Sequence, residues 1–339
     1  MKNFDLIIIT NLPAFYKINL FNRVAQSLSV LVIFTHDSST QRNEDFYHGT
    51  RNFHSVSIAN MSGFKKSLFL IKLLFKNPNC RLLLGGWDYF LYWIAAFLRK
   101  KKHNELIIES SYIESKTSGL KGFTKRLFLK RITKAYASGT SQIKLLHNLN
   151  FKGEIIKTKG VGIFNIVPQP AFSTRNCVSD FIYVGRLSPE KNLKFLIQTF
   201  NTLPNLRLNI IGFGPEEYVL KSIAKSNVNF YGAIVNSELH KFYQQNDVFI
   251  LPSLSEPWGM VVEEALNNGL PVIVSDKVGC AEEIVNEKNG LIFKLSEPLS
   301  IFEAIKKITD IQFYNSLRQN ISQIDFNKLA EEQVNCYLG

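Results

Sequence analysis

Short runs rich in Ile, Leu and Val alternate with longer segments of helical periodicity along most of the chain. This alternation restricts the fold more than any other feature of the sequence, because strands joined by helices pair in parallel and the helices then cover both faces of the sheet. In the N-terminal half the pattern predicts strands at 6–9, 30–34, 81–84, 106–109, 135–138 and 155–157. It predicts helices in that half at 18–28, 64–75 and 87–98.

The alternation is interrupted once, between residues 158 and 178, where Gly160, Gly162, Pro168 and Pro170 indicate a linker. Beyond it, strands are predicted at 180–184, 207–211, 228–231, 248–251 and 271–275. The helices predicted in this half are 192–202, 215–225, 237–245 and 259–268. We therefore expect an α/β protein with two doubly wound, Rossmann-like domains, residues 1–165 and 166–324.

This organisation indicates where a ligand site is expected. In doubly wound sheets ligands bind beyond the carboxyl ends of the strands, so two such domains facing across a cleft would share a site in that cleft. The final segment, about 325–339, is predicted to be a helix. Packing of this helix back onto the N-terminal domain is one arrangement open to it.

Composition excludes several classes of protein. A chain of 339 residues that is 45% hydrophobic can fill two cores, which excludes disorder. The four cysteines are far apart and form no CxxC pair, which argues against a zinc site or a disulfide framework and favours a reducing compartment. The apolar run at 6–9 is too short for a signal peptide or a membrane span and is expected to be a first buried strand.

Positive charge is concentrated in the N-terminal half. Residues 1–150 contain 22 Lys and Arg against 8 Asp and Glu, whereas residues 151–339 contain 18 against 20. Two basic stretches, 63–76 and 119–136, interleave Lys and Arg with Phe and Leu at helical spacing. Helices of this kind bind anionic bilayers, although apolar residues at this spacing more often face the core of the protein. The asymmetry favours an anionic partner for this half, and no nucleic-acid-binding motif is present.

The segment VGRLSPEKN places Arg186 and Lys191 on a turn between a predicted strand and a predicted helix. Helix N-termini and cationic side chains both stabilise a diphosphate, and a transferase must stabilise that diphosphate as it leaves. A surface turn with two solvated cations is the alternative interpretation, and a single Arg–Lys pair does not decide between them.

The segment SEPWGMVVEEA places Glu256 just before a predicted helix and Glu264 on it. Their separation suits the two ends of one ligand better than two carboxylates that share a proton. The first turn of this helix, from Gly259 to Val261, has free amides that suit phosphate. The neighbouring Glu263 is expected to point elsewhere and receives no role, and a solvated acidic helix face is the alternative. Two cations and two spaced acids together suit a nucleotide sugar.

A glycine turn, IIGFGPEE, follows another predicted strand. Gly212 and Gly214 would permit close approach of the backbone to a ligand. The third glycine of the dinucleotide fingerprint is missing, which disfavours a nicotinamide-dependent oxidoreductase. The glycine pair alone is weak support for any ligand, because many such turns contain glycine.

Taken together, these segments resemble the donor-binding domain of the retaining glycosyltransferases of family 4, which have the GT-B fold. The resemblance runs from about residue 180 to residue 293, with the segments in order and with the family's E-x7-E spacing for the acid pair. It is carried by VGRLSPEKN, IIGFGPEE, SEPWGMVVEEALNNGLPVIVSD and VGCAEEIV. The first 165 residues match the family only in outline.

The resemblance implies roles for the residues of the C-terminal domain. Arg186 and Lys191 would bind the donor diphosphate, Glu264 would accept hydrogen bonds from the ribose, and Glu256 would contact the transferred sugar. The backbone amides that would hold the donor belong to Gly259, Met260 and Val261. The resemblance also implies that no metal is essential and that the leaving phosphate takes the proton of the acceptor.

The N-terminal domain would supply the acceptor side of the site. The turn after the first strand, TNLPAFYKINLF, has a proline where many family members have two glycines, and its Thr10 and Asn11 would approach the donor. Glu109 follows another strand and would face the sugar, with a capping or solvated carboxylate as the alternative. The GGW turn would place Trp87 on the acceptor side.

The sequence thus predicts an enzyme that transfers a hexose from a nucleotide diphosphate sugar, with retention and an α-linkage. The expected acceptor is a lipid-linked or surface-polysaccharide precursor of O-antigen, capsule or lipooligosaccharide type. We expect a cytoplasmic protein attached peripherally to the inner face of the cytoplasmic membrane. A basic nucleic-acid- or membrane-binding module with a vestigial sugar site and a nucleotide-sugar epimerase of similar fold are the alternatives.

Overall fold

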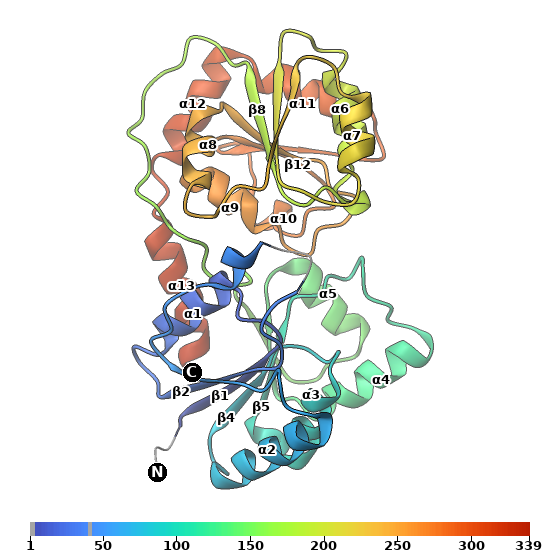
Figure 1. The fold of residues 1–339 in the computed structure, drawn as a ribbon, viewed down its shortest axis with the longest axis vertical. Helices are drawn as coiled ribbons and strands as arrows, with labels where there is room; N and C mark the ends of the chain where they lie inside the picture. The colour runs from blue at the N-terminus through green and yellow to red at the C-terminus, as the bar shows by residue number, and fades with distance from the viewer. Residues whose placement is uncertain (1–3, 40–42) are drawn as a thin grey trace. The chain divides into compact units, whose positions relative to one another are not determined.

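The computed structural model of the chain describes residues 4–39 and 43–339. The chain divides into two compact units, one of residues 1–163 with 328–339 and one of residues 164–327. Each unit contains one open, entirely parallel sheet with helices on both faces (Figure 1). The prediction of two doubly wound α/β sheets is confirmed.

The sheet of the first unit has seven strands in the order β3-β2-β1-β4-β5-β6-β7. The chain builds outward from β1 in one direction, crosses over, and continues from β4 in the other. The carboxyl ends of β1 and β4 therefore form the switch point at which sheets of this kind bind ligands. The strands are β1 (Leu6–Thr10), β2 (Val30–Phe34), β3 (His54–Ser57), β4 (Arg81–Leu84), β5 (Asn104–Ile108), β6 (Lys134–Ala137) and β7 (Glu154–Lys157).

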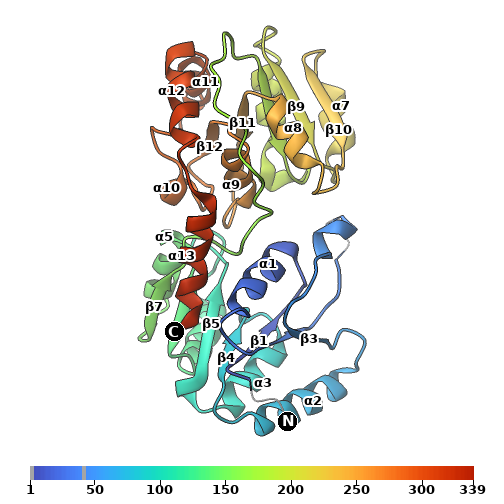
Figure 2. The same ribbon diagram turned by 90° about the vertical axis from the view of Figure 1, so that its left-hand side faces the viewer.

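Helices cover both faces of this sheet. Helices α1 and α13 lie on one face, and α2, α3 and α4 lie on the other (Figures 1 and 2). The central strands are buried from both sides, which explains their continuous apolar sequences: every residue of β1 is buried. The helices are α1 (Phe15–Val24), α2 (Gly63–Lys76), α3 (Phe90–Leu98), α4 (Gly119–Leu129), α5 (Thr140–Asn148) and α13 (Phe326–Leu338), with short 3-10 turns η1 (Glu44–Tyr47) and η2 (Lys101–His103).

The C-terminal part of α13 completes the first unit. The ring of Tyr337 stacks on Tyr136 with a centroid separation of 4.6 Å. Arg81 donates from Nη1 to the carbonyl oxygen of Tyr337 at 2.9 Å and forms two further hydrogen bonds of 2.9 Å with the carboxylate of Glu105. A charge-assisted pair of this kind fixes the helix end in position as well as contributing contact energy.

The sheet of the second unit has six strands in the order β10-β9-β8-β11-β12-β13. Its switch point lies between β8 and β11. The strands are β8 (Asp180–Val184), β9 (Arg207–Ile211), β10 (Val228–Gly232), β11 (Val248–Leu251), β12 (Val272–Ser275) and β13 (Gly290–Phe293).

Helices α6 and α7 cover one face of this second sheet, and α8 and α9 cover the other (Figure 1). The helical elements are η3 (Pro189–Lys191), α6 (Leu193–Phe200), α7 (Glu217–Ile223), α8 (Leu239–Gln245), α9 (Met260–Asn267), α10 (Ala281–Ile284), α11 (Ser300–Ile308) and α12 (Ile311–Ile321). Over residues 4–39 and 43–339, no helix combines the length and the apolar composition needed to cross a membrane.

Candidate functional site

The turns that follow β8, β9 and β11 converge at one edge of the second sheet, and glycines allow them to do so. A Cβ atom on Gly212 would lie 1.8 Å from the carbonyl oxygen of Gly185, and one on Gly214 would lie 2.4 Å from that of Leu187. The amide of Leu187 donates to the carbonyl oxygen of Phe213 at 2.9 Å. The sequence predicted that Gly212 and Gly214 admit a ligand, but the backbone they approach in the structure is that of the neighbouring turn.

A second pair of loops interlocks at the same edge. A Cβ atom on Gly279 would lie 2.0 Å from the carbonyl oxygen of Pro257. The amides of Gly279 and Cys280 donate to the carbonyl oxygens of Glu256 and Trp258, each at 2.8 Å. These contacts fix the loop that carries Glu256 to the turn after β12, so the carboxylate is presented from a rigid base.

Lys191 and Glu256 form an ion pair between Nζ and Oε2 at this edge. Both side chains are largely buried, with 10% and 15% of their surface exposed. The amide of Leu254 donates to the carbonyl oxygen of Glu190 at 2.8 Å, which joins the two loops that carry the pair. The family resemblance implied separate roles for the two residues, on the diphosphate and on the sugar. The structure brings them into direct contact.

Arg186 lies beside this pair and is more accessible. Its Nη2 donates to Glu190 Oε1 at 2.8 Å, and Ser188 Oγ donates to the same oxygen at 2.7 Å. Burial acts to raise the pKa of Glu190, but the hydrogen bond from Ser188 and the charges of Arg186 and Lys191 outweigh it, so the pKa is lowered. Glu190 therefore remains ionised and orients the guanidinium, whose side chain is 30% exposed.

Helix α9 begins at this edge with its backbone in an unusual conformation. Gly259, which precedes its first residue, has a φ of 95°, a value that side chains strongly disfavour. A Cβ atom at this position would also lie 2.9 Å from Val278 Cγ1. The amides of Met260 and Val261 belong to the first turn of the helix, where no intrahelical carbonyl partner exists, and they supply donors for an anion.

Glu264 and Glu263 lie on α9 in different surroundings. Tyr243 Oη lies 3.3 Å from Glu264 Oε2 and donates to it, and burial together with the Glu264 charge raises the pKa of the tyrosine. Trp258 Nε1 donates to Glu263 Oε2 at 2.7 Å. Burial raises the pKa of Glu263 to about 8, although the Trp258 hydrogen bond opposes the shift. Sequence reasoning gave Glu263 no role, whereas the structure uses it to hold the PWG loop.

In the first unit, Lys17 contacts three of the residues predicted for the acceptor side. Lys17 Nζ lies 2.9 Å from Glu109 Oε1 and donates to Asn11 Oδ1 at 3.1 Å and to Thr10 Oγ1 at 3.4 Å. Only 4% of Lys17 is exposed. Burial acts to lower its pKa, but the carboxylate of Glu109 outweighs burial and raises it.

These contacts change the interpretation of two predicted residues in the first unit. The carboxylate of Glu109 is paired with Lys17 and its side chain is 32% exposed, and its position facing the sugar remains a prediction. Trp87 is 7% exposed and belongs to the core of this unit, with Lys125 Nζ 5.3 Å from its ring centroid. A place for Trp87 on an acceptor surface remains a prediction.

Sequence reasoning missed Lys17 because the first helix was predicted to begin at Ile18, whereas α1 begins at Phe15. With the correct start, Lys17 falls on a helix whose other buried residues are apolar. A lysine at such a position needs a buried partner, because an isolated buried charge is costly. That signal was available in the sequence, and Glu109 was a candidate partner.

Comparison with known proteins adds the family. Residues 176–325 match the model of the family described as glycosyl transferases group 1. The chain carries a domain of that family. The family match spans every residue discussed above for the second unit, from Gly185 to Cys280. The predicted resemblance to glycosyltransferases of this group is confirmed over these residues.

Relatives of known name match part of the chain. The chain is 32% identical over 157 residues to sulfoquinovosyl transferase SQD2 of Arabidopsis thaliana, which covers 46% of this chain and 30% of that protein. It is 30% identical over 151 residues to UDP-Gal:alpha-D-GlcNAc-diphosphoundecaprenol alpha-1,3-galactosyltransferase of Escherichia coli, which covers 41% and 39% of the two chains. The chain thus spans less than half the length of these relatives.

Solved structures extend the likeness to the whole fold. The lipopolysaccharide outer core galactosyltransferase WaaB, in its apo form, superposes with a TM-score of 0.71 at 16% identity over 98% of each chain. Alr3699/HepE of Anabaena, in complex with UDP and glucose, superposes with a TM-score of 0.69 at 14% identity, covering 96% of this chain and 97% of that one. The prediction of the GT-B fold is confirmed.

Proposed function

We propose that this protein is a retaining glycosyltransferase of family 4, which transfers a hexose from a nucleotide diphosphate sugar. The observation that carries the proposal is the Lys191–Glu256 ion pair, beside Arg186 and the first turn of α9, at the carboxyl edge of the second sheet. The glucose and UDP bound to a protein of the same fold support a donor of this class. The proposed product has an α-linkage.

The donor diphosphate would replace Glu256 as the partner of Lys191. Two nearly buried charges already neutralise each other in the pair, so the arriving phosphates compete with the carboxylate for the ammonium group. Glu256, once released from Lys191, would accept hydrogen bonds from the hydroxyl groups of the sugar. Arg186 and the amides of Met260 and Val261 would bind the remaining phosphate oxygens.

Charge on the leaving diphosphate increases as the bond to the sugar breaks. Donors that are already in place stabilise this charge without reorganising, and that stabilisation is commonly the largest contribution to catalysis. We propose that Lys191 and Arg186 provide it, that no divalent metal is needed, and that the leaving phosphate accepts the proton of the attacking hydroxyl. Glu264, oriented by Tyr243, would bind the ribose at the other end of the donor.

The proposed acceptor is a lipid-linked or surface-polysaccharide precursor. A relative 30% identical to this chain is named for transfer to a diphosphoundecaprenol-linked sugar, which supports an acceptor at a membrane. In the first unit, Thr10, Asn11 and Glu109 surround Lys17 at the carboxyl ends of β1 and β5, where an acceptor hydroxyl would meet polar groups. These residues form the proposed acceptor side.

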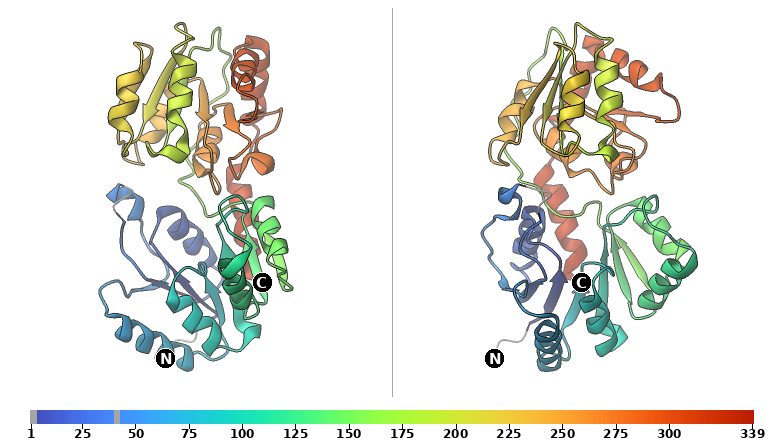
Figure 3. Two further views of the ribbon diagram at one scale, coloured as in Figure 1. Left: turned by 90° about the vertical axis from the view of Figure 1, so that its right-hand side faces the viewer. Right: turned by 45° about the vertical axis from the view of Figure 1, so that its right-hand side comes forward.

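The outer face of α2, α3 and α4 supports attachment to an anionic membrane, on the cytoplasmic side. Figure 3 (left) views the first unit from the side that these three helices cover. Exposed aromatic and aliphatic side chains are found on all three: Phe64 is 79% exposed, Phe90 76% and Leu120 78%. The basic stretches on α2 and α4, residues 63–76 and 119–136, contain no Asp or Glu. An apolar surface ringed by cations is typical of proteins that bind anionic bilayers reversibly.

A transfer assay tests the proposed reaction. Purified protein is incubated with nucleotide sugars and a lipid-linked oligosaccharide acceptor, and the anomeric configuration of the product is read by NMR. The proposal predicts an α-linked product, formed equally well with EDTA present. A β-linked product would contradict retention, sugar release or epimerisation without an acceptor would contradict transfer, and loss of activity in EDTA would contradict the metal-free mechanism.

A further inference from the structure

A pocket of about 230 Å³ opens in the first unit where α2 and α3 end. The residues before β4 and β5 form it, so it lies at the amino ends of these strands, whereas Thr10 and Glu109 follow the carboxyl ends of β1 and β5. The pocket is therefore distinct from the proposed acceptor side. The side chains used in the following argument are Phe75, Leu98, Arg99, Lys100, Lys102 and His103.

The lining of this pocket is strongly basic. In the part of the chain that the structure describes, none of Arg99, Lys100 and Lys102 forms an ion pair with a carboxylate. The effect on His103 is direct: burial first, and then the positive charges of Arg99, Lys102 and Lys100, lower the pKa of its imidazole. The positive charges of Arg99, Lys100 and Lys102 are therefore not neutralised by a carboxylate.

Arg99 forms the rigid base of the pocket. It is 5% exposed, and its guanidinium donates to the carbonyl oxygens of Leu74, Asn77 and Cys80, which fixes the end of α2 to the end of α3. Its Nε is buried and has no hydrogen-bond partner among the described residues. A buried donor without an acceptor is costly, and a bound anion is one way to satisfy it.

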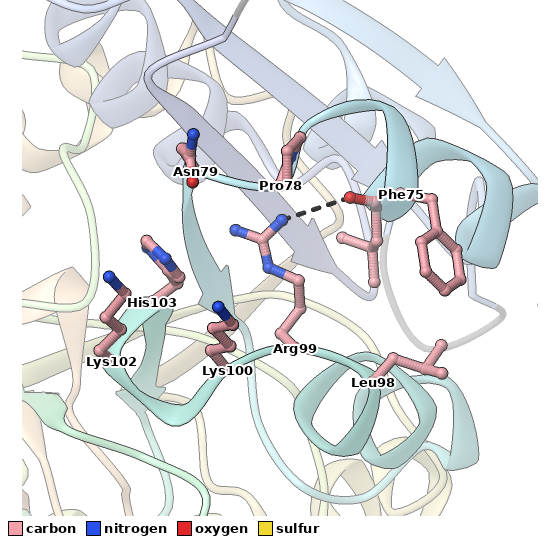
Figure 4. A pocket seen from close by; sticks show the side chains of 9 residues that line it. Phe75, Pro78, Asn79, Leu98, Arg99, Lys100, Lys102 and His103 are labelled. Atoms are coloured by element: carbon pink, nitrogen blue, oxygen red, sulfur yellow. Dashed lines mark hydrogen bonds between the residues drawn. The ribbon is translucent and has the colours of Figure 1, made fainter.

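The lining is also divided by polarity. Figure 4 shows the Arg99 guanidinium in the middle of the pocket lining, with Lys102 and His103 to one side and Phe75 and Leu98 to the other. Phe75 is 73% exposed and Leu98 44% exposed. A free phosphate would satisfy the basic side but leave this apolar rim in water. An amphiphile that joins a phosphate to hydrocarbon chains would match both sides.

We propose that this pocket binds the headgroup of an anionic phospholipid, with the phosphate oxygens near Lys100, Lys102 and Arg99 Nε and the acyl chains along Phe75 and Leu98. The inference rests on the proposed membrane attachment and names the lipid recognised at one place on that surface. At about 230 Å³ the pocket is smaller than the ~300–1,000 Å³ of sites for drug-sized ligands, which suits a phosphate-sized headgroup.

The first test compares two charge-matched variants of the full chain by co-sedimentation with vesicles of phosphatidylcholine alone or mixed with phosphatidylglycerol. Lys100→Gln/Lys102→Gln alters the pocket, and Lys65→Gln/Lys72→Gln removes the same charge from α2 outside it. We expect the pocket variant to lose roughly tenfold more affinity for the mixed vesicles than the control, about 1.4 kcal/mol. Equal losses would overturn the pocket while leaving membrane attachment intact. If the wild-type protein failed to bind the mixed vesicles, both would fail.

The second test uses soluble probes and the imidazole of His103, assigned by comparison with a His103→Gln variant. NMR titrations are run with short-chain dihexanoyl phosphatidylglycerol and with glycerol 3-phosphate. We expect the lipid to raise the pKa of His103 clearly more than glycerol phosphate does, because only the lipid uses the apolar rim. An equal response to both probes, or none to either, would contradict the lipid site. Nucleotides that bind the proposed donor site should raise the melting temperature of Lys100→Gln/Lys102→Gln as much as that of the wild type. This result separates the lipid site from the donor site.

Discussion

At the scale of single residues, the Lys191–Glu256 pair links two tasks that the sequence left separate. In the proposed mechanism, the pair keeps the cation that would bind phosphate and the carboxylate that would bind the sugar in position before the donor arrives. Each charge neutralises the other while the site is empty, so neither is buried without a partner. In the proposed mechanism, donor binding then exchanges Glu256 for phosphate as the partner of Lys191.

Replacement of Lys191 by Ala should slow transfer by roughly 10²–10³-fold, as loss of a group that stabilises transition-state charge commonly does. The measurement is the initial rate of sugar transfer at saturating donor. Lys194→Ala is the matched control, because Lys194 is exposed on the neighbouring helix α6 and should retain its rate. Near-normal rates for Lys191→Ala would remove Lys191 from the mechanism.

Loss of Lys191 also leaves Glu256 unpaired, which costs about 3–5 kcal/mol when a buried pair is broken. Lys191→Met/Glu256→Gln removes both charges and is expected to unfold closer to the wild-type melting temperature than Lys191→Ala does. If this double variant transferred sugar at the wild-type rate, the defect of Lys191→Ala would be a defect of folding and not of chemistry.

Glu263 should make stability depend on pH. Its pKa rises from 4.5 to about 8 on folding, so the folded state holds the proton more tightly than the unfolded state does. The free energy of unfolding of the wild type should therefore fall as pH rises from about 4.5 through about 8. Glu263→Gln should not show that decline. Between about pH 5 and about pH 9, its free energy of unfolding should therefore rise relative to that of the wild type by on the order of 1–2 kcal/mol, a value reduced to allow for solvent screening.

Thermal unfolding of both proteins at the two pH values measures this difference. Parallel pH profiles for the wild type and Glu263→Gln would contradict a raised pKa at Glu263. Glu303→Gln is a suitable control, because Glu303 is an exposed residue of α11, and this variant should show the wild-type decline.

The sequence indicated Arg186, Lys191, Glu256 and Glu264 because they fall in two segments, VGRLSPEKN and SEPWGMVVEEA, that resemble the donor-binding motifs of a known family. It could not show that Lys191 meets Glu256, since 65 residues separate them and only the packing of two loops brings them together. Lys17 was missed for a local reason, a helix start placed three residues too late. Its pairing with Glu109 again depends on tertiary structure.

At the scale of elements, the turns after β8 and β9 are held together by close contacts between backbones. Gly212 adopts a φ of 134°, and a Cβ atom there would meet the carbonyl oxygen of Gly185. Gly212→Ala should therefore destabilise the protein by on the order of 2–3 kcal/mol and reduce transfer by displacing the turn that carries Arg186.

Chemical denaturation of Gly212→Ala measures this effect. Gly63→Ala is the control, because a Cβ atom on Gly63 would meet nothing within 4 Å and its φ lies outside the positive range. We expect Gly63→Ala to unfold at about the wild-type denaturant concentration. A Gly212→Ala protein as stable as this control would show that the two turns move apart without cost.

The central strands were predictable because helices bury them on both faces, so their sequences are continuously apolar. β3, the edge strand His54–Ser57, was missed because it is exposed or half-buried and carries polar residues. β13 was missed because it begins with glycine, a residue that strands seldom favour. The helices α10, α11 and α12 follow the last predicted strand, where the alternation no longer guided the prediction.

At the scale of the whole molecule, chemistry and charge are divided between the two units. The proposed donor residues and the family match lie in the second unit, while the first carries the excess of basic residues and the exposed aromatic side chains of α2, α3 and α4. This division agrees with one unit that binds a soluble nucleotide sugar and another that meets an anionic surface. Neither property could have been assigned from the fold alone, because this fold hosts many functions.

The most direct measurement is a thermal-shift panel in which UDP, GDP, ADP, dTDP and CMP and their common sugar conjugates are added to the wild type and to Glu264→Ala. A ligand that binds only the folded state raises its melting temperature. We predict that one nucleotide raises the melting temperature selectively and that Glu264→Ala abolishes the rise, because the ribose loses its carboxylate acceptor. A rise of equal size in Glu264→Ala, or no rise with any nucleotide in the wild type, would contradict the donor site.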